Sequence, residues 1–227
     1  MTDRSSPAPA RAAALCTAFA RVYPDAHCEL DYANPLQLLV ATILSAQCTD
    51  VQVNKVTPAL FKRYPTAQAY AEADPAELET ALKAIGLFRA KAKNIRAAAQ
   101  LLVRDHGGQV PQTMDELVRL PGVGRKTANV VLGNAFGQNI GVVVDTHVAR
   151  LSGRLALTRH TDPAKIEPVL MKLVPQKDWT LFSHWLIFQG RRRCKAAHPN
   201  CPNCEVASLC PSHPRFIKLR EQKTSRK

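Results

Sequence analysis

The sequence has few acidic residues, few aromatic residues and no long hydrophobic run. Its 18 aspartates and glutamates stand against 31 lysines and arginines, which gives a formal net charge of +13 at pH 7. This imbalance predicts a polyanionic partner, either nucleic acid or an acidic membrane surface. No apolar stretch has the length of a membrane span, and residues 12–20 are too short and too weakly apolar for a secretory signal. We therefore expect a cytoplasmic or nucleoid-associated protein with no membrane-spanning segment.

The remaining composition favours a helical protein, with 46% hydrophobic but only 6% aromatic residues in a chain long enough for one or two domains. Helix-start signals, an Asn or Asp followed by proline, recur along the chain and predict an all-α fold. We expect helices over residues 15–23, 36–44, 51–63, 74–86, 87–105, 128–132 and 178–189, with further starts at Asp145 and Asp162. Residues 140–144 are β-branched but have no partner strand, so a buried extended connector is expected there. Residues 1–11 and the basic tail after Pro214 are expected to be disordered or flexible.

Seven cysteines in a chain without a secretory signal are expected to be reduced thiols or metal ligands. Four of them are clustered with the spacing C-x6-C-x2-C-x5-C, namely Cys194, Cys201, Cys204 and Cys210. Four thiolates need a cation to offset their charge, and all-sulfur ligation suits zinc or an iron–sulfur cluster. The spacing alone leaves both open. The isolated Cys16, Cys28 and Cys48 are expected to be ordinary thiols.

A glycine hairpin, Leu120-Pro121-Gly122-Val123-Gly124, is followed at once by Arg125, Lys126 and an apolar helical run. Glycine allows a tight turn, and the amide groups at the start of the next helix favour an anion such as a phosphate. A capping box, Thr113-x-x-Glu116, predicts a short helix before the hairpin. The pattern is therefore helix, hairpin, helix, with a lysine in the first turn of the second helix. The cations of residues 89–96 either follow a phosphate backbone or form a solvated face.

These motifs together resemble the endonuclease III family of DNA glycosylases. The residues that carry the resemblance are 120–128, Val144-Asp145-Thr146-His147, the four clustered cysteines, 44–50 and 85–87, within a match from about residue 15 to 210. The resemblance implies a helix-hairpin-helix fold of two helical domains with a DNA-binding cleft between them. Residues 28–138 would form a six-helix barrel with the hairpin, and residues 1–27 plus 139–217 a domain with one [4Fe–4S] cluster on the four cysteines. Residues 218–227 would remain as a basic, flexible tail.

By the same resemblance, Lys126 is the nucleophile and Asp145 the catalytic carboxylate. An enzyme that acts on a base takes it out of the stack, after which an amine can attack the anomeric carbon and form a Schiff base. Gln47 and Leu87 match the positions that fill the gap left by the flipped nucleotide and wedge the duplex. The hairpin residues Gly122, Val123, Gly124 and Arg125, together with His147, are further expected DNA contacts.

The expected function is a bifunctional DNA glycosylase and AP lyase. Its partner would be double-stranded DNA with oxidised pyrimidines or abasic sites, and the chain is expected to be a monomer. One alternative is a related glycosylase of the same fold that acts on mismatched adenine, alkylated bases or pyrimidine dimers. Another is a DNA-binding module without catalysis, in which hairpin and cluster only hold DNA.

Overall fold

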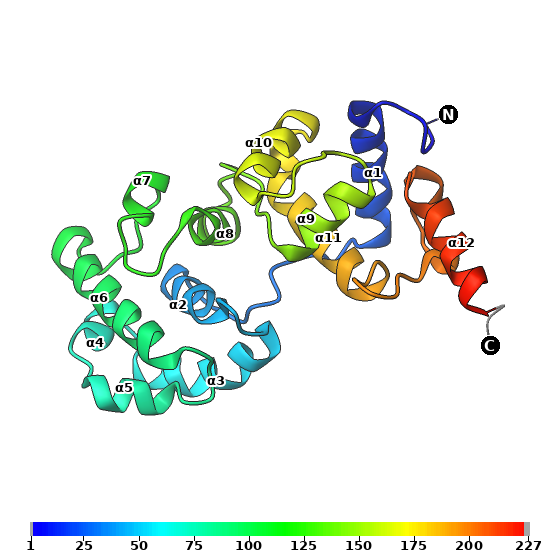
Figure 1. Ribbon diagram of the computed structural model, residues 1–227. Coiled ribbons are helices and arrows are strands. Elements are labelled where there is room, and N and C mark those ends of the chain that lie inside the picture. The colour runs from blue at the N-terminus through cyan, green and yellow to red at the C-terminus, as the bar shows by residue number, and fades with distance from the viewer. Residues whose placement is uncertain (1, 225–227) are drawn as a thin grey trace. The chain divides into compact units, whose positions relative to one another are not determined.

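Residues 2–224 are described by a computed structural model, in which they form twelve α-helices and three short 3-10 helices and no β-strand (Figure 1). The all-α prediction is therefore confirmed. The chain divides into two compact units, one made of residues 28–138 and the other of residues 1–27 with 139–227. Among the described residues, no helix combines the length and the apolar character that a bilayer crossing requires.

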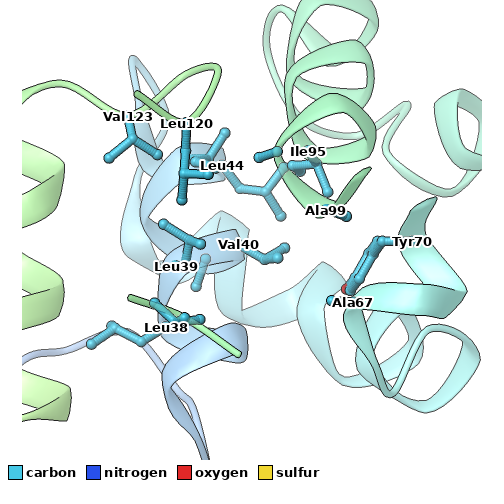
Figure 2. Packing of buried hydrophobic residues seen from close by; sticks show 14 of the residues in the cluster. Leu38, Leu39, Val40, Leu44, Ala67, Tyr70, Ile95, Ala99, Leu120 and Val123 are labelled. Atoms are coloured by element: carbon cyan, nitrogen blue, oxygen red, sulfur yellow. The ribbon is translucent and has the colours of Figure 1, made fainter. Parts of the chain in front are cut away.

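The unit of residues 28–138 is built around its most apolar helix, α2. Its helices are α2 (Pro35–Ser45), α3 (Asp50–Arg63), α4 (Ala67–Ala71), α5 (Pro75–Ala81), α6 (Phe88–His106), α7 (Met114–Leu117) and α8 (Arg125–Ala135). Seven consecutive residues of α2, from 38 to 44, are buried. Figure 2 shows α2 side chains between Leu120 and Val123 of the hairpin on one side and Ile95 and Ala99 of α6 on the other. The hairpin is thus anchored in the core by its own apolar residues.

Side-chain caps set most helix starts in this unit, as the sequence predicted. The side-chain oxygens of Asn34, Asp74 and Thr113 each accept a hydrogen bond from the backbone N–H three residues later, at 2.9–3.3 Å. Helix α4 was not predicted. It is only five residues long and is capped by Thr66, and its Tyr70 is fully buried. So short a segment shows too little periodicity for helix to be predicted from sequence.

The other unit has its own hydrophobic core. Its helices are α1 (Ala8–Val22), α9 (Thr146–Arg154), α10 (Pro163–Leu173), α11 (Trp179–Arg192) and α12 (His213–Thr224), with 3-10 helices at Gln176–Asp178, Cys201–Asn203 and Ala207–Leu209. Asp145 and Asp162 cap α9 and α10 as predicted. Val142–Val144 are buried without forming a strand, and the Val143 N–H donates to Ser183 Oγ at 3.0 Å. The extended connector is therefore confirmed over these residues, whereas Ile140 is exposed.

The first residues are more ordered than the composition suggested. Helix α1 starts at Ala8, and Arg11 is buried. Its Nε donates to the carbonyl of Leu155 at 2.8 Å and its Nη2 to that of Ala156 at 2.7 Å. The expectation of disorder was therefore wrong for residues 8–11, because this arginine fastens the start of α1 to the end of α9.

The C-terminal segment also differs from the prediction of a flexible tail over residues 218–227. Helix α12 continues through Thr224, and residues 225–227 lie outside the described residues. Pro214 stands in its first turn, where the missing N–H costs no helical hydrogen bond. The Arg154 guanidinium lies over the Phe216 ring, 4.6 Å from its centroid. This contact attaches α12 to α9.

Candidate functional site

The hairpin before α8 is a tight turn that requires glycine. Gly122 has φ +80°, and the Val123 N–H donates to the Leu120 carbonyl at 3.0 Å. With Pro121 at the second position, these are the features of a type II turn, which needs a positive φ at its third residue. A Cβ on Gly122 would lie 3.0 Å from the Asn94 Cβ of α6. The turn therefore both bends the chain and packs closely against α6.

Helix α8 begins without a side-chain cap, and Lys126 is its second residue. Its N-cap is Gly124, in an extended conformation with φ −94° and with open space where a Cβ would stand. Gly124 therefore offers the first-turn amides no side-chain acceptor, and Arg125 and Lys126 are exposed beside them. Uncapped amides at a helix start, next to two cations, are suited to bind a phosphate group.

Gln47 and Leu87 are brought together on two neighbouring loops. Both have a left-handed backbone, with φ values of +54° and +59°, although neither is glycine. A Cβ on Gly86 would lie 3.8 Å from the Gln47 carbonyl oxygen, so the loops nearly touch. Leu87 is 59% exposed, while Gln47 is also exposed. Strained backbone that holds an exposed apolar side chain is a common feature of functional loops.

Lys91 supports the loop of Gln47 from inside, a role that the sequence did not suggest. The lysine is only 4% exposed, and its Nζ donates to the Leu44 carbonyl, close to the end of α2, at 2.8 Å. Burial lowers its pKa. It therefore belongs to neither the phosphate-tracking face nor the solvated face expected for residues 89–96. Because the cations of this helix are not spaced along a single face, the sequence alone does not show which of them points inward.

Asp145 caps α9 and is half-buried in the second unit. Its Oδ1 accepts the Val148 N–H at 2.8 Å, and no hydrogen bond to Oδ2 is seen among the described residues. Asp145 also acts on the pKa of His184. Burial is the main cause that lowers this pKa to about 4, and the charge of His27 adds to it, whereas the charge of Asp145 raises it. Lys126 belongs to the unit of residues 28–138 and Asp145 to the other.

His147 is held by its own helix and by α11. The Arg150 Nη2 donates to His147 Nδ1 at 3.1 Å, which leaves His147 Nε2 as the ring donor. Gly190 of α11 approaches so closely that a Cβ there would lie 2.6 Å from His147 Nδ1. The sequence predicted that α11 ends at this glycine, and that was wrong. The glycine allows α9 and α11 to come together, and α11 continues to Arg192.

The four clustered cysteines lie close enough to influence one another. Burial, and then the thiols of Cys194 and Cys210, raise the pKa of Cys201. Burial raises the pKa of Cys204 to about 11, and the same two thiols act in the same direction. Among residues 2–224, no group of three or more His, Cys, Asp or Glu side chains is found that could hold a metal ion.

Two N–H donors point at the sulfur atoms. Arg154 Nη1 lies 3.2 Å from Cys194 Sγ, and Gln189 Nε2 lies 3.2 Å from Cys204 Sγ. The Tyr23 hydroxyl in turn donates to Gln189 Oε1 at 2.5 Å, in a buried position. Donors of this kind stabilise negative charge on sulfur, so the cysteine set fits a ligand that binds thiolates.

The loop after Cys194 is fixed by two arginines that the sequence analysis did not single out. Arg150 Nε and Nη2 donate to the Cys194 carbonyl, and Arg154 donates to the carbonyls of Lys195 and Ala196 at 2.8 and 2.7 Å. Burial first, and then Arg154, lower the pKa of Arg150. Because Arg150 and Arg154 are four residues apart, the sequence indicated that they lie on the same face of α9. It did not show that this face meets the loop after Cys194.

A model of the HhH-GPD superfamily of base excision DNA repair proteins matches residues 40–176. Endonuclease III of Synechocystis sp. is 57% identical over 202 residues, covering 89% of this chain and 92% of that protein. Endonuclease III of Escherichia coli (strain K12) is 42% identical over 182 residues, which cover 80% of this chain and 86% of that protein. A solved structure of a trapped endonuclease III–DNA covalent intermediate has a TM-score of 0.87 at 45% identity and covers 92% of this chain and 98% of that one. The chain therefore belongs to the endonuclease III family within the HhH-GPD superfamily.

Proposed function

We propose that this chain excises oxidised pyrimidines from double-stranded DNA, with Lys126 as the nucleophile and Asp145 as the catalytic carboxylate. As a member of the endonuclease III family, the chain is a base excision repair DNA glycosylase and AP lyase. The observation that carries the residue assignment is the exposed primary amine of Lys126 at the uncapped start of α8. An amine in the first turn of a helix can reach a sugar whose phosphate lies at the start of that helix.

In the proposed reaction, the Lys126 amine attacks C1′ of the flipped nucleotide. The glycosidic bond breaks, its electron pair leaves with the damaged base, and the sugar opens to a Schiff base on the lysine. Loss of a proton from C2′ then expels the 3′ phosphate by β-elimination. The related protein in the trapped complex also forms a covalent intermediate with DNA, which supports a covalent route here.

Asp145 is proposed to stabilise the positive charge that develops on the sugar. Its Oδ1 is engaged by the Val148 N–H, which fixes the carboxylate, and its Oδ2 is left for a further partner. A fixed carboxylate aimed at developing positive charge is a form of electrostatic preorganisation. In the same proposal, His147 and the hairpin residues Gly122–Arg125 contact the DNA.

Gln47 and Leu87 are proposed to fill the space left by the flipped nucleotide and to wedge the duplex. The left-handed backbone at both positions and the exposure of Leu87 support this role. Insertion between base pairs removes an exposed apolar side chain from water. The free energy released by this burial offsets part of the cost of unstacking the bases.

We further propose that Cys194, Cys201, Cys204 and Cys210 hold one [4Fe–4S] cluster, a group that the endonuclease III family is known to carry. An all-thiol set with N–H donors on two of its sulfurs fits such a cluster. Cys194, Cys201, Cys204 and Cys210 would each supply one thiolate ligand to it. When bound, it would supply a rigid cross-link between the C-terminal loops. The reaction above requires no electron transfer from it.

The remaining proposals concern the partner and the place of action. The net charge of +13 supports binding to the DNA of the nucleoid. We propose that the chain acts there as a monomer. If phosphate contacts supply most of the affinity, the logarithm of the binding constant should fall linearly with the logarithm of salt concentration.

Borohydride trapping tests the nucleophile. A duplex with a single thymine glycol should give a covalent protein–DNA adduct with the wild type and none with Lys126→Gln. The matched control is Lys62→Gln, which removes another exposed lysine of the same unit, at the end of α3, and should leave the adduct unchanged. An adduct of normal yield with Lys126→Gln would refute the assignment. DNA binding without any wild-type adduct would instead favour a non-catalytic module.

The lesion and the carboxylate need separate measurements. Single-turnover excision should be faster on duplexes with thymine glycol than on duplexes with an A·G mismatch, a methylated purine or a pyrimidine dimer, and the reverse order would refute the substrate proposal. Asp145→Asn preserves a good N-cap but removes the charge, so the fold should persist while excision slows roughly 100-fold or more. An excision rate equal to that of the wild type would refute the role of Asp145.

A further inference from the structure

A pocket of about 630 Å³ lies between α9, the loop that follows it and the start of α12. Small-molecule sites in proteins have volumes of roughly 300–1,000 Å³, so the pocket has the size of a ligand site. All its lining residues belong to the same compact unit. It exists because α12 is helical and attached to α9 through Phe216. None of the motifs described above uses it.

The pocket is lined by cations and by no acidic side chain. Its charged and titratable lining residues are Arg150, Arg154, Arg159, His160 and Arg215. Hydroxyl groups of Thr158, Thr161 and Ser212 also line it. Water-filled pockets with only one sign of charge concentrate ions of the opposite sign. The composition of the lining therefore indicates an anionic ligand.

The cations differ in how firmly they are held. Arg150 and Arg154 are half-buried and are held by the backbone carbonyls of residues 194–196, so they add fixed positive charge to the pocket wall while several of their N–H groups are already engaged. Arg159 and Arg215 are exposed, and no hydrogen bond or ion pair of either side chain is seen among the described residues. The guanidinium groups of Arg159 and Arg215 are thus available to a ligand. An arginine can bind a phosphate group by donating two parallel N–H···O hydrogen bonds to its oxygen atoms.

The backbone adds a further favourable contribution. Ser212 and Arg215 stand at the start of α12, a helix of twelve residues whose N-terminal end adjoins the pocket. Part of this helix start is already occupied, because the His213 N–H donates to the Cys210 carbonyl at 3.1 Å and Pro214 has no N–H. The partial positive charge of the helix start still favours an anion and adds to the attraction of the guanidinium groups.

We propose that this pocket binds phosphate groups, with Arg159 and Arg215 as the principal ligand residues. The phosphates belong either to a small phosphorylated molecule, such as a nucleotide, or to the DNA backbone. This proposal does not depend on the roles proposed for Lys126 and Asp145. The phosphate pocket and the catalytic assignment can therefore be refuted independently of each other.

Calorimetric titration with pyrophosphate tests the site in the full-length protein. The double variant Arg159→Gln/Arg215→Gln should bind pyrophosphate at least tenfold more weakly than the wild type. The charge-matched control Lys165→Gln/Lys172→Gln removes two exposed lysines of α10, outside the pocket, and should bind as the wild type does. Equal weakening in both variants would show a general charge effect and would refute the site. Absence of wild-type binding at physiological salt would refute it as well.

Competition with an undamaged duplex identifies the source of the phosphate. If DNA occupies the pocket, pyrophosphate should displace the duplex, and the Arg159/Arg215 variant should lose more duplex affinity than the lysine control. If a small molecule is the ligand, saturating duplex should leave the pyrophosphate affinity unchanged. Far-ultraviolet circular dichroism of both variants should match the wild type, because the exchanged side chains make no internal hydrogen bond or ion pair.

Discussion

Replacement of Gly122 by alanine should destabilise the unit of residues 28–138 by about 1–5 kcal/mol. Gly122 has φ +80°, and alanine in a left-handed conformation costs about 1–2 kcal/mol. The new Cβ would lie 3.0 Å from the Asn94 Cβ and 3.1 Å from its Nδ2, and overpacking of this kind costs about 1–3 kcal/mol. Alanine also restricts the unfolded chain, which offsets about 0.4–1 kcal/mol of the loss.

The assay must report on the correct unit. Both tryptophans, Trp179 and Trp185, lie in α11, so their fluorescence follows the unit that does not contain Gly122. Urea unfolding should therefore be followed by hydrogen exchange and mass spectrometry of peptides from α6 and α8. In Gly122→Ala these peptides should lose protection at lower urea, while the tryptophan transition should keep its midpoint if the units unfold independently.

Gly124→Ala is the matched control for this substitution. Gly124 has φ −94° and nothing within 4 Å of an added Cβ, so neither strain nor overpacking arises. Alanine is a poorer N-cap than glycine, but it also restricts the unfolded chain, and the two effects should cancel to within about 0.5 kcal/mol. Equal effects of the two substitutions would refute the reasoning from backbone strain.

Further predictions concern three buried side chains. Burial lowers the pKa of His184 to about 4, so the unfolded chain takes up a proton at higher pH than the folded protein does. The free energy of unfolding of its unit should therefore fall by about 3 kcal/mol as the pH is lowered from 6.5 to 4. Urea unfolding followed by tryptophan fluorescence should show this loss in the wild type but not in His184→Phe. Lys91→Met leaves the Leu44 carbonyl without its donor, which should cost about 1–2 kcal/mol and speed hydrogen exchange in residues 45–49. Gln189→Leu removes the hydrogen bond to Cys204, and in cluster-loaded protein the reduction potential should fall by about 40 mV, the equivalent of about 1 kcal/mol for one electron. Voltammetry measures this shift, and an unchanged potential would argue against the hydrogen bond.

Local signals in the sequence predicted the helix starts well, because a capping residue acts within its own first turn. Asn34, Asp145 and Asp162 all cap helices where expected. The motif around Gly122 likewise predicted its turn, because proline and glycine restrict the backbone directly. The sequence was therefore most informative wherever the cause and the effect lie within four residues of each other.

Long-range partners could not be predicted in the same way. Arg11 is ordered by carbonyls 144 and 145 residues away, and Lys91 by one 47 residues away. Nothing near either residue in the chain distinguishes it from an exposed cation. The left-handed backbone of Gln47 was equally hidden, because non-glycine residues rarely adopt it and only the surrounding fold imposes it.

The helix starts of the unit of residues 28–138 fall into two groups that match the proposed functions. Helices α2, α3, α4, α5 and α7 each have a side-chain cap, whereas α6 and α8 begin at Leu87 and Gly124 without one. Relative to a side-chain cap, the glycine at Gly124 costs only a few tenths of a kcal/mol, whereas the leucine at Leu87 costs about 1 kcal/mol. These two starts carry the proposed wedge and the proposed nucleophile. A cap at α8 would occupy the amides that a phosphate needs, and a polar residue in place of Leu87 would remove the apolar wedge. The proposed wedge and the proposed nucleophile would therefore each use a helix start at which no side chain caps the backbone.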